Sequence, residues 1–286
     1  MPIVIENLTH TYMEKSPFQA TAIQDINLTV GDGDFLGVIG HTGSGKTTLM
    51  MHMNGLLKPT EGRVLVDGKD INEKGFVKRE VRKKVGIVFQ YPEHQLFEES
   101  IALDVAFGPK NLGLSQVEID ERVQEALERV GISKDLAGRS PFELSGGQMR
   151  RVAIAGVLAM RPQVLILDEP AAGLDPKGRK EILSLVQELH ASGVTVVMVS
   201  HSMEDMALLA TRIAVMHRGK LVMAGPPEEI FAQEDALFQI GLDAPAVCRL
   251  AEALRERGIP VPKDVYQPKL LEDFLLSYFA DRKKES

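Results

Sequence analysis

The chain is poor in cysteine, in tryptophan and in long apolar runs. Its 286 residues include one cysteine, Cys248, and no tryptophan. A single cysteine excludes an intramolecular disulfide and a thiolate metal cluster, and it suits a reducing cytoplasm. No apolar run approaches the ~20 residues that cross a bilayer, and the first residues lack the basic and apolar segments of a signal peptide. We expect a cytosolic chain that meets a membrane only through a partner.

An excess of positive charge is also missing. The formal net charge is -7, so nothing in the overall charge favours binding to nucleic acid or to an anionic lipid surface. The short basic runs at residues 78–79 and 82–84 are typical of a solvated helix face. With 44% hydrophobic and 26% charged residues, the composition is that of a soluble globular protein.

Short apolar runs that fit strands alternate with helical patterns. Residues 35–39 are almost continuously apolar, as in a buried parallel strand, whereas residues 3–12 alternate, as in a half-exposed strand. Further strands are predicted at residues 63–66, 85–89, 164–167 and 194–199. A helical pattern around Ile182 lies between the last two, which gives a βαβ unit and therefore a parallel sheet. Residues 93–160 have a helical texture, so we expect a helical insertion within an α/β core.

A glycine-rich motif follows the strand at residues 35–39. It consists of Gly40, His41, Thr42, Gly43, Ser44, Gly45, Lys46 and Thr47, and it fits the pattern G-x-x-x-x-G-K-[ST]. Its glycines let backbone N–H groups converge on phosphate oxygens at a helix N-terminus, where an anion is favoured. Lys46 is expected to reach the outer phosphates and the Thr47 hydroxyl to bind Mg²⁺. Thr48 is the last residue that we expect to contact the nucleotide in this segment. We expect the helix to run from Lys46 to about Leu56.

Two acidic residues, Asp168 and Glu169, follow the apolar strand at residues 164–167. That strand carries them to its carboxyl end, where ligands bind in open α/β sheets. Asp168 can help to hold the metal through its water shell, and Glu169 is placed to orient or deprotonate an attacking water. The alternative is that Glu169 is only a solvated acid at a strand end, but Pro170 and residues 173–176 strengthen the functional interpretation.

A third motif, Leu144–Gln148, lies between the first two in the sequence. Taken by itself, it predicts a serine N-cap before a helix that begins near Gln148. Ser145 supplies a hydroxyl, and Gly146 and Gly147 permit close backbone approach. Because an uncovered helix start is what an anion needs, the structural and the functional interpretations of this segment are compatible.

With all three motifs in this order, residues 3–225 resemble the nucleotide-binding subunit of an ATP-binding cassette (ABC) transporter. The resemblance implies a P-loop core with a mostly parallel sheet, an antiparallel β edge, a helical insertion and a small helical C-terminal region. It also implies that Ser145, Gly146, Gly147 and Gln148 bind the γ-phosphate of an ATP held by a second subunit.

The same resemblance assigns roles to four more residues. Gln90 matches the glutamine that contacts metal and water and senses the γ-phosphate. His201 matches the switch histidine, and Asp175 matches a loop that crosses the dimer interface. Tyr12 matches the aromatic residue that stacks on adenine, although an ordinary surface tyrosine is the alternative. Glu169, His201 and Gln90 are thus the predicted catalytic residues, with Thr47, Gln90 and Asp168 at the metal.

A closer resemblance is to the ATPases of energy-coupling factor (ECF) importers of vitamins or metal ions. It is carried by residues 90–97, 104–109 and 141–151. Residues 16–18 and His41 look most like the second ATPase of such a pair. The resemblance implies three partners, namely a related ABC ATPase in a heterodimer, a multi-span membrane scaffold and a substrate-capture membrane protein. It implies a peripheral location at the cytoplasmic membrane face and no nucleic acid.

The predicted domain organisation follows from these segments. Residues 1–225 form the cassette, with the helical subdomain at about 93–160, and residues 226–286 form a helical dimerisation region. Amphipathic patterns near Leu250 and Phe274 support helices in that region, which either pack on the core or pair with another subunit's tail. An ATPase of another ABC transporter, or a cassette of translation or DNA repair, is the alternative function.

Overall fold

The computed structural model describes residues 2–284, and the side chains of residues 2–280. Its centre is a six-stranded sheet in the order β10-β9-β3-β8-β7-β6. Neighbouring strands pair in parallel except β10, which pairs antiparallel with β9 at one edge. The strands are β3 (Phe35–Ile39), β6 (Val85–Val88), β7 (Val164–Asp168), β8 (Thr195–Val199), β9 (Arg212–His217) and β10 (Lys220–Gly225).

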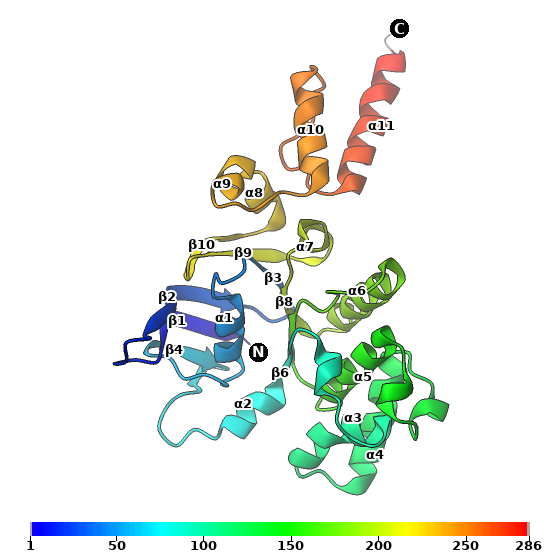
Figure 1. The fold of residues 1–286 in the computed structure, drawn as a ribbon. Coiled ribbons are helices and arrows are strands. Elements are labelled where there is room, and N and C mark those ends of the chain that lie inside the picture. Colours follow the sequence, from blue (N-terminus) through cyan, green and yellow to red (C-terminus); the bar gives the residue numbers. More distant parts are fainter. Residues whose placement is uncertain (1, 285–286) are drawn as a thin grey trace.

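A second, antiparallel sheet has the order β2-β1-β4-β5. It contains β1 (Ile3–Tyr12), β2 (Ala20–Val30), β4 (Glu61–Val66) and β5 (Lys69–Asp70). Helix α1 (Lys46–Met53) shares one apolar core with this sheet and with alternate residues of the central strands. The other alternate residues of those strands face a second core. The central strands are therefore buried on both faces, as their continuous apolar sequences predicted (Figure 1).

Further helices pack against the central sheet. They are α2 (Lys78–Lys84), α3 (Ile101–Asn111), α4 (Gln116–Arg129), α5 (Gly146–Leu158), α6 (Pro176–Ala191) and α7 (Met203–Leu209). Val81 of α2 lies in the core shared with α1, whereas α3 to α7 contribute to the second core. Of these helices, α3, α4 and α5 lie within residues 93–160. Short 3₁₀ turns at Pro92–Gln95, Lys134–Leu136 and Pro141–Glu143 connect them. The predicted α/β fold class is confirmed, and the basic runs at residues 78–84 do form a helix.

The final segment leaves the body of the molecule. It contains α8 (Pro227–Phe231), α9 (Glu234–Gln239), α10 (Ala246–Glu256) and α11 (Pro268–Lys284). Figure 1 shows α10 and α11 side by side, pointing away from the sheets. Cys248 on α10 and Leu271 on α11 are buried against the core, whereas Leu250 and Leu276 are exposed. Of the helices between residues 2 and 284, none combines the length and the apolar character that a membrane span requires.

Several predicted boundaries were wrong by one to three residues; for example, strand β4 begins at Glu61 and not at Arg63. Helix α1 ends at Met53, so Leu56 lies beyond it. Strand β6 ends at Val88 and not at Phe89. Helix α5 begins at Gly146, two residues before Gln148, because Ser145 and Gln148 cap each other across its first turn.

Candidate nucleotide site

Four neighbouring strands deliver the predicted site to one edge of the central sheet. Strands β3, β8, β7 and β6 are adjacent and parallel, so their carboxyl ends share an edge. The glycine-rich loop follows β3 and His201 follows β8. Asp168 ends β7, with Glu169 next, and Gln90 lies exposed two residues after β6. The topology thus gathers residues that are more than 100 positions apart in the sequence.

The glycine-rich loop is organised around Lys46. Lys46 is buried (7% exposed), and its ammonium donates to the backbone oxygens of Gly40 at 2.6 Å and His41 at 2.8 Å. Burial lowers the pKa of Lys46, while Glu169 and Asp168 act to raise it. Ser44 Oγ is buried and has no hydrogen-bond partner. A loop with an inward ammonium and an unpaired buried hydroxyl is suited to receive phosphate oxygens.

Thr47 and Asp168 meet at the mouth of this loop. The Thr47 hydroxyl donates to Asp168 Oδ2 at 3.1 Å. Burial raises the pKa of Asp168, and the bond from Thr47 and the charge of Lys46 act against that rise. A hydroxyl and a carboxylate oxygen are the hard ligands that Mg²⁺ takes beside substrate phosphates and water. Groups of three or more His, Cys, Asp or Glu side chains that could hold a metal ion do not occur among the described residues, so such an ion would rely on those other ligands.

Glu169 has an unusual backbone for a residue with a Cβ. Its φ is 50°, in the left-handed region, and its N–H donates to Val199 O at 3.0 Å. Its Oε1 lies 3.2 Å from His201 Nε2. Burial, followed by the charge of Asp168, raises the pKa of Glu169 to about 7. Strained backbone is often kept where it positions a functional group, and a carboxylate with a pKa near neutrality is suited to accept a proton.

Tyr12 lies at the end of β1 with 39% of its surface exposed. Its hydroxyl is 3.2 Å from Thr48 Oγ1 at the start of α1. The His10 ring packs nearly perpendicular to the Tyr12 ring, with ring centroids 4.5 Å apart. Behind His10 lies His52, which is fully buried and has both ring nitrogens unpaired. The sequence motifs gave no indication of this histidine pair, because no pattern marks it.

The Leu144–Gln148 motif forms an open helix start. Ser145 Oγ accepts the Gln148 N–H at 3.3 Å, and Gln148 Oε1 accepts the Ser145 N–H at 3.0 Å. A Cβ at Gly146 or Gly147 would meet no atom within 4 Å. These residues share a cavity of about 590 Å³ with Asp175, whose carboxylate caps α6 by accepting the Gly178 N–H at 2.7 Å. No residue of the glycine-rich loop lines this cavity.

Arg150 is a residue whose role was missed from the sequence. It is 1% exposed and forms a two-bond ion pair with Glu93, at 2.9 and 2.7 Å. It also donates to the backbone oxygens of Pro170 and Ala172. Burial alone would raise the pKa of Glu93, but Arg150 holds it below its usual value. Arg150 therefore ties α5 to the loop after Glu169 and to the segment after Gln90.

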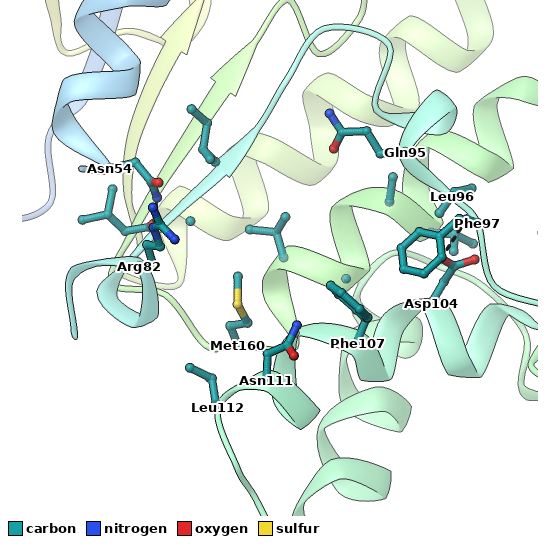
Figure 2. A pocket seen from close by; sticks show the side chains of 18 of the residues that line it. Asn54, Arg82, Gln95, Leu96, Phe97, Asp104, Phe107, Asn111, Leu112 and Met160 are labelled. Atoms are coloured by element: carbon teal, nitrogen blue, oxygen red, sulfur yellow. Dashed lines mark hydrogen bonds between the residues drawn. The ribbon is translucent and has the colours of Figure 1, made fainter. Parts of the chain in front are cut away.

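A groove of about 540 Å³ separates the helical insertion from the core. Figure 2 shows Phe97, Phe107, Leu112 and Met160 around it. Phe97 and Phe107 are 59% and 46% exposed, with ring centroids 5.1 Å apart and their planes perpendicular. On the core side, Arg82 of α2 adds a positive charge to the lining. The groove is thus mainly apolar with a cationic border.

The fold and site together define a nucleotide-binding cassette, and comparison with known proteins agrees. The profile of the family described as ABC transporter matches residues 23–172. The chain is 53% identical to the energy-coupling factor transporter ATP-binding protein EcfA2 of Caldanaerobacter subterraneus subsp. tengcongensis, over 99% of each chain. The protein of the same name from Symbiobacterium thermophilum is 58% identical over 93% of this chain and 92% of its own.

Solved structures agree as well. CbiO1 from Clostridium perfringens, part of the ABC transporter complex CbiONQ, is 39% identical with a TM-score of 0.73, over 87% of this chain and 98% of that one. The cassette MJ0796, in a dimer bound to ADP and Pi, is 30% identical with a TM-score of 0.70, over 79% and 98%. The chain therefore belongs to the ABC transporter family, as an ATPase subunit of the energy-coupling factor type.

Proposed function

We propose that this chain pairs with a second, related ABC ATPase and that the pair powers uptake of a vitamin or a metal ion. In this proposal the pair docks at the cytoplasmic face of the cell membrane on a multi-span scaffold, beside a substrate-capture membrane protein. The named relatives support an ECF assembly.

The observation that carries the pairing is the separation of two phosphate-facing elements. The glycine-rich loop contributes residues 41–44 to one cavity, and residues 145–148 line another. The two cavities have no lining residue in common. A head-to-tail partner would place its own open helix start over the loop of this chain, so each ATP would be held by both subunits.

Within one such site, Lys46 and the backbone of the loop bind the outer phosphates, and Tyr12 stacks on adenine. Thr47 and Asp168, with Gln90, would hold Mg²⁺, which when bound neutralises charge on the phosphates. Glu169 accepts a proton from the attacking water. His201, 3.2 Å from Glu169, orients that carboxylate. Loss of the γ-phosphate then removes the contact that joins the two subunits.

The groove beside the helical insertion is the docking surface for the scaffold in this proposal. Exposed aromatic rings such as Phe97 and Phe107 are costly to leave in water. An amphipathic helix of the scaffold would bury them by the helix-in-groove mode. Arg82 at the border would meet acidic residues of that helix. Gln95 of the same lining lies five residues after Gln90, which links the groove to the nucleotide edge.

The C-terminal helices would form a second contact between the two ATPases. Leu250 on α10 is 53% exposed, and Leu276 on α11 is 64% exposed. These helices lie apart from the sheets (Figure 1), so the exposed apolar side chains are free to meet another chain. Residues 226–286 are therefore the proposed dimerisation region. The cargo is selected by another chain, the capture protein.

The test is a tagged pull-down of this chain from detergent-solubilised native membranes, followed by mass spectrometry. The expected result is a second cassette, one multi-span scaffold and one or more small membrane proteins. Recovery of two large permease subunits would instead indicate an ordinary ABC transporter. Recovery of ribosomes or DNA ends would overturn the transport function while leaving the ATPase in place.

A matched control strengthens this experiment. Phe107→Asp in the groove should release the scaffold but retain the second ATPase, because the groove shares no lining residue with the cavity at residues 41–44 or with the one at residues 145–148. Val117→Asp, at an exposed apolar position on α4 that does not line the groove, should retain both partners. Scaffold recovery that is the same for the two variants would contradict the assignment of the groove.

A further inference from the structure

The phosphate-binding loop touches the C-terminal region at Gly241. A Cβ added at Gly241 would lie 2.5 Å from Nε2 of His41 and 3.4 Å from its Cε1. The imidazole of the loop therefore rests directly on the backbone of a residue 200 positions further along the chain. Residues 239–241 and 41–44 line one cavity of about 590 Å³, together with residues 217–218.

The backbone at Gly241 is held firmly. Helix α9 ends in a Schellman motif, in which the Gly241 N–H donates to Phe238 O at 2.8 Å and the Leu242 N–H to Leu237 O at 2.9 Å. Gly241 has a φ of 76°, the left-handed conformation that this motif requires of its terminal residue. Leu237 and Leu242 are buried, so the surface under the His41 ring is anchored in the core.

The segment after Gly241, residues 241–246, also reaches the helix that follows His201. The Ala246 N–H donates to Glu204 Oε1 at 3.3 Å, and Glu204 lies in the first turn of α7. Further on, the Gln267 amide donates to Ala207 O in the same helix. The C-terminal region therefore contacts the phosphate-binding loop and the helix that follows the loop of His201.

We propose that the C-terminal region senses nucleotide through the contact between His41 and Gly241. Phosphate that binds to the loop repositions the His41 ring, and the ring acts on the end of α9 and on the segment that leads into α10. Because coupling between two sites is reciprocal, association of α10 and α11 with a partner changes ATP affinity to the same extent. This inference rests on the proposed nucleotide site and adds a route for its regulation.

Hydrogen exchange tests the contact directly in the full-length chain. The Glu169→Gln protein, which should bind ATP without turning it over, is compared with and without saturating Mg²⁺-ATP. We expect exchange at the amides of residues 241 and 242 to slow by roughly fivefold, the lower end of typical coupling. The effect should disappear when His41→Ala is added. An equal effect in both proteins, or none in either, would overturn the proposal.

A pair of glycine substitutions gives the second test. Gly258 ends α10 with the same motif as Gly241, since its N–H donates to Arg255 O at 2.9 Å and the Ile259 N–H to Leu254 O at 3.0 Å. Its φ is 83°, but an added Cβ would meet nothing within 4 Å. Gly241→Ala and Gly258→Ala thus impose the same backbone strain, and both should lower the melting temperature similarly. Only Gly241→Ala also pushes on His41.

The measured quantity is the Kd for ATP of each full-length variant. Gly241→Ala should weaken binding by roughly fivefold or more relative to Gly258→Ala. In a His41→Ala background the two substitutions should give the same Kd, because the ring that transmits the effect is gone. The proposal would be contradicted if the two glycine variants had equal Kd values with His41 present, or if their Kd values still differed in the His41→Ala background.

These outcomes can be told apart from failure of the proposed function. A chain that binds no ATP in its unsubstituted form would contradict the nucleotide site itself. Normal ATP binding with equal glycine variants would contradict only the coupling. The identity of the membrane partners affects neither measurement.

Discussion

The phosphate-binding loop and the Leu144–Gln148 helix start differ in what surrounds them. In the loop, Lys46 and Ser44 are buried, and Lys46 is bonded to its own backbone carbonyls. At the helix start, Ser145 is exposed, and Gly146 and Gly147 have open space above them. The first element therefore buries its lysine and one hydroxyl within its own chain, whereas the second leaves its serine exposed at the edge of a cavity.

This difference separates two ways of building an anion site. A buried loop can bind phosphate by itself, because its donors already converge. An exposed helix start offers its N–H groups to a cavity that is open to solvent, so water competes with an anion until another protein covers it. Substitutions in the loop should therefore act on the isolated chain, and substitutions at the helix start should act only after pairing.

The largest expected effect concerns Glu169, which stands at the edge where the two elements would meet. Glu169→Gln should retain ATP binding and lower turnover by roughly 10²–10⁴, the usual contribution of a general base. Phosphate release by the assembled pair measures turnover, and ATP binding is measured separately. Glu188→Gln, exposed on α6, is the matched control. Near-normal turnover in the Glu169 variant would remove it from this role.

The second effect concerns Arg150. It lies on α5, the helix that begins at the Leu144–Gln148 motif, and it bonds to the loop after Glu169. Arg150→Met should lower the free energy of unfolding by about 3–5 kcal/mol, because Glu93 is left buried without its partner. Arg129→Met breaks only an exposed ion pair with Glu125 and should cost less than about 1 kcal/mol. Urea denaturation compares the two. Equal losses would show that the Arg150 network contributes no more than a surface pair.

The third prediction compares the phosphate-binding loop directly with the Leu144–Gln148 helix start. Lys46→Ala should weaken ATP binding by the isolated chain by about 10- to 100-fold, the value of a charge-assisted hydrogen bond. Ser145→Ala should leave that affinity alone but reduce turnover once a partner cassette is present. ATP titration of the isolated chain and phosphate release by the pair measure these effects. Weaker binding by the isolated Ser145 variant would place both elements in one site and refute the pairing.

The smallest effect concerns the histidine pair behind the loop. Burial, with the charges of His10 and Lys78, lowers the pKa of His52 from 6.5 to about 4. The folded state thus favours neutral His52, so its stabilising contribution is full above pH 6.5 and is lost as the pH falls towards 4. Between pH 7 and pH 5 this amounts to about 2 kcal/mol.

His52→Leu provides the control for that measurement. Leucine has a similar volume and no group to protonate, and both ring nitrogens of His52 lack partners in the fold, so the substitution should be close to neutral at pH 7. Denaturation curves at the two pH values should show the larger acid loss for the unsubstituted protein. Identical pH dependence would indicate that His52 does not titrate in this range.

The site residues that could be predicted from the sequence are those marked by a motif next to an apolar strand. Lys46, Thr47, Asp168 and Glu169 each follow an apolar strand within a few residues, so strand recognition placed them at one edge. Gln90 and His201 were assigned by resemblance, and the parallel order of β6, β7, β8 and β3 brings both to that edge. The predicted α/β fold followed from the same strand patterns.

The contacts that the sequence did not reveal join residues far apart in the chain. Arg150 and Pro170 are 20 positions apart, and His41 lies 200 positions from Gly241. No periodicity marks such pairs, because a buried arginine or an isolated glycine has many possible partners until the chain is folded. Helix ends were shifted for a local reason, as at Gly146, where a capping box starts the helix earlier than apolar spacing suggests.

The separate cavities at residues 41–44 and 145–148 have a kinetic consequence. In the proposed pairing, one chain would carry two half-sites and no whole one, while a pair would carry two whole sites. Hydrolysis by the isolated ATPases should therefore rise with the square of chain concentration when most chains are unpaired, and linearly once pairs predominate. Dilution of the isolated ATPases would lower the rate per chain. The membrane scaffold holds two cassettes close together, so in the assembled transporter the rate per chain would not depend on concentration.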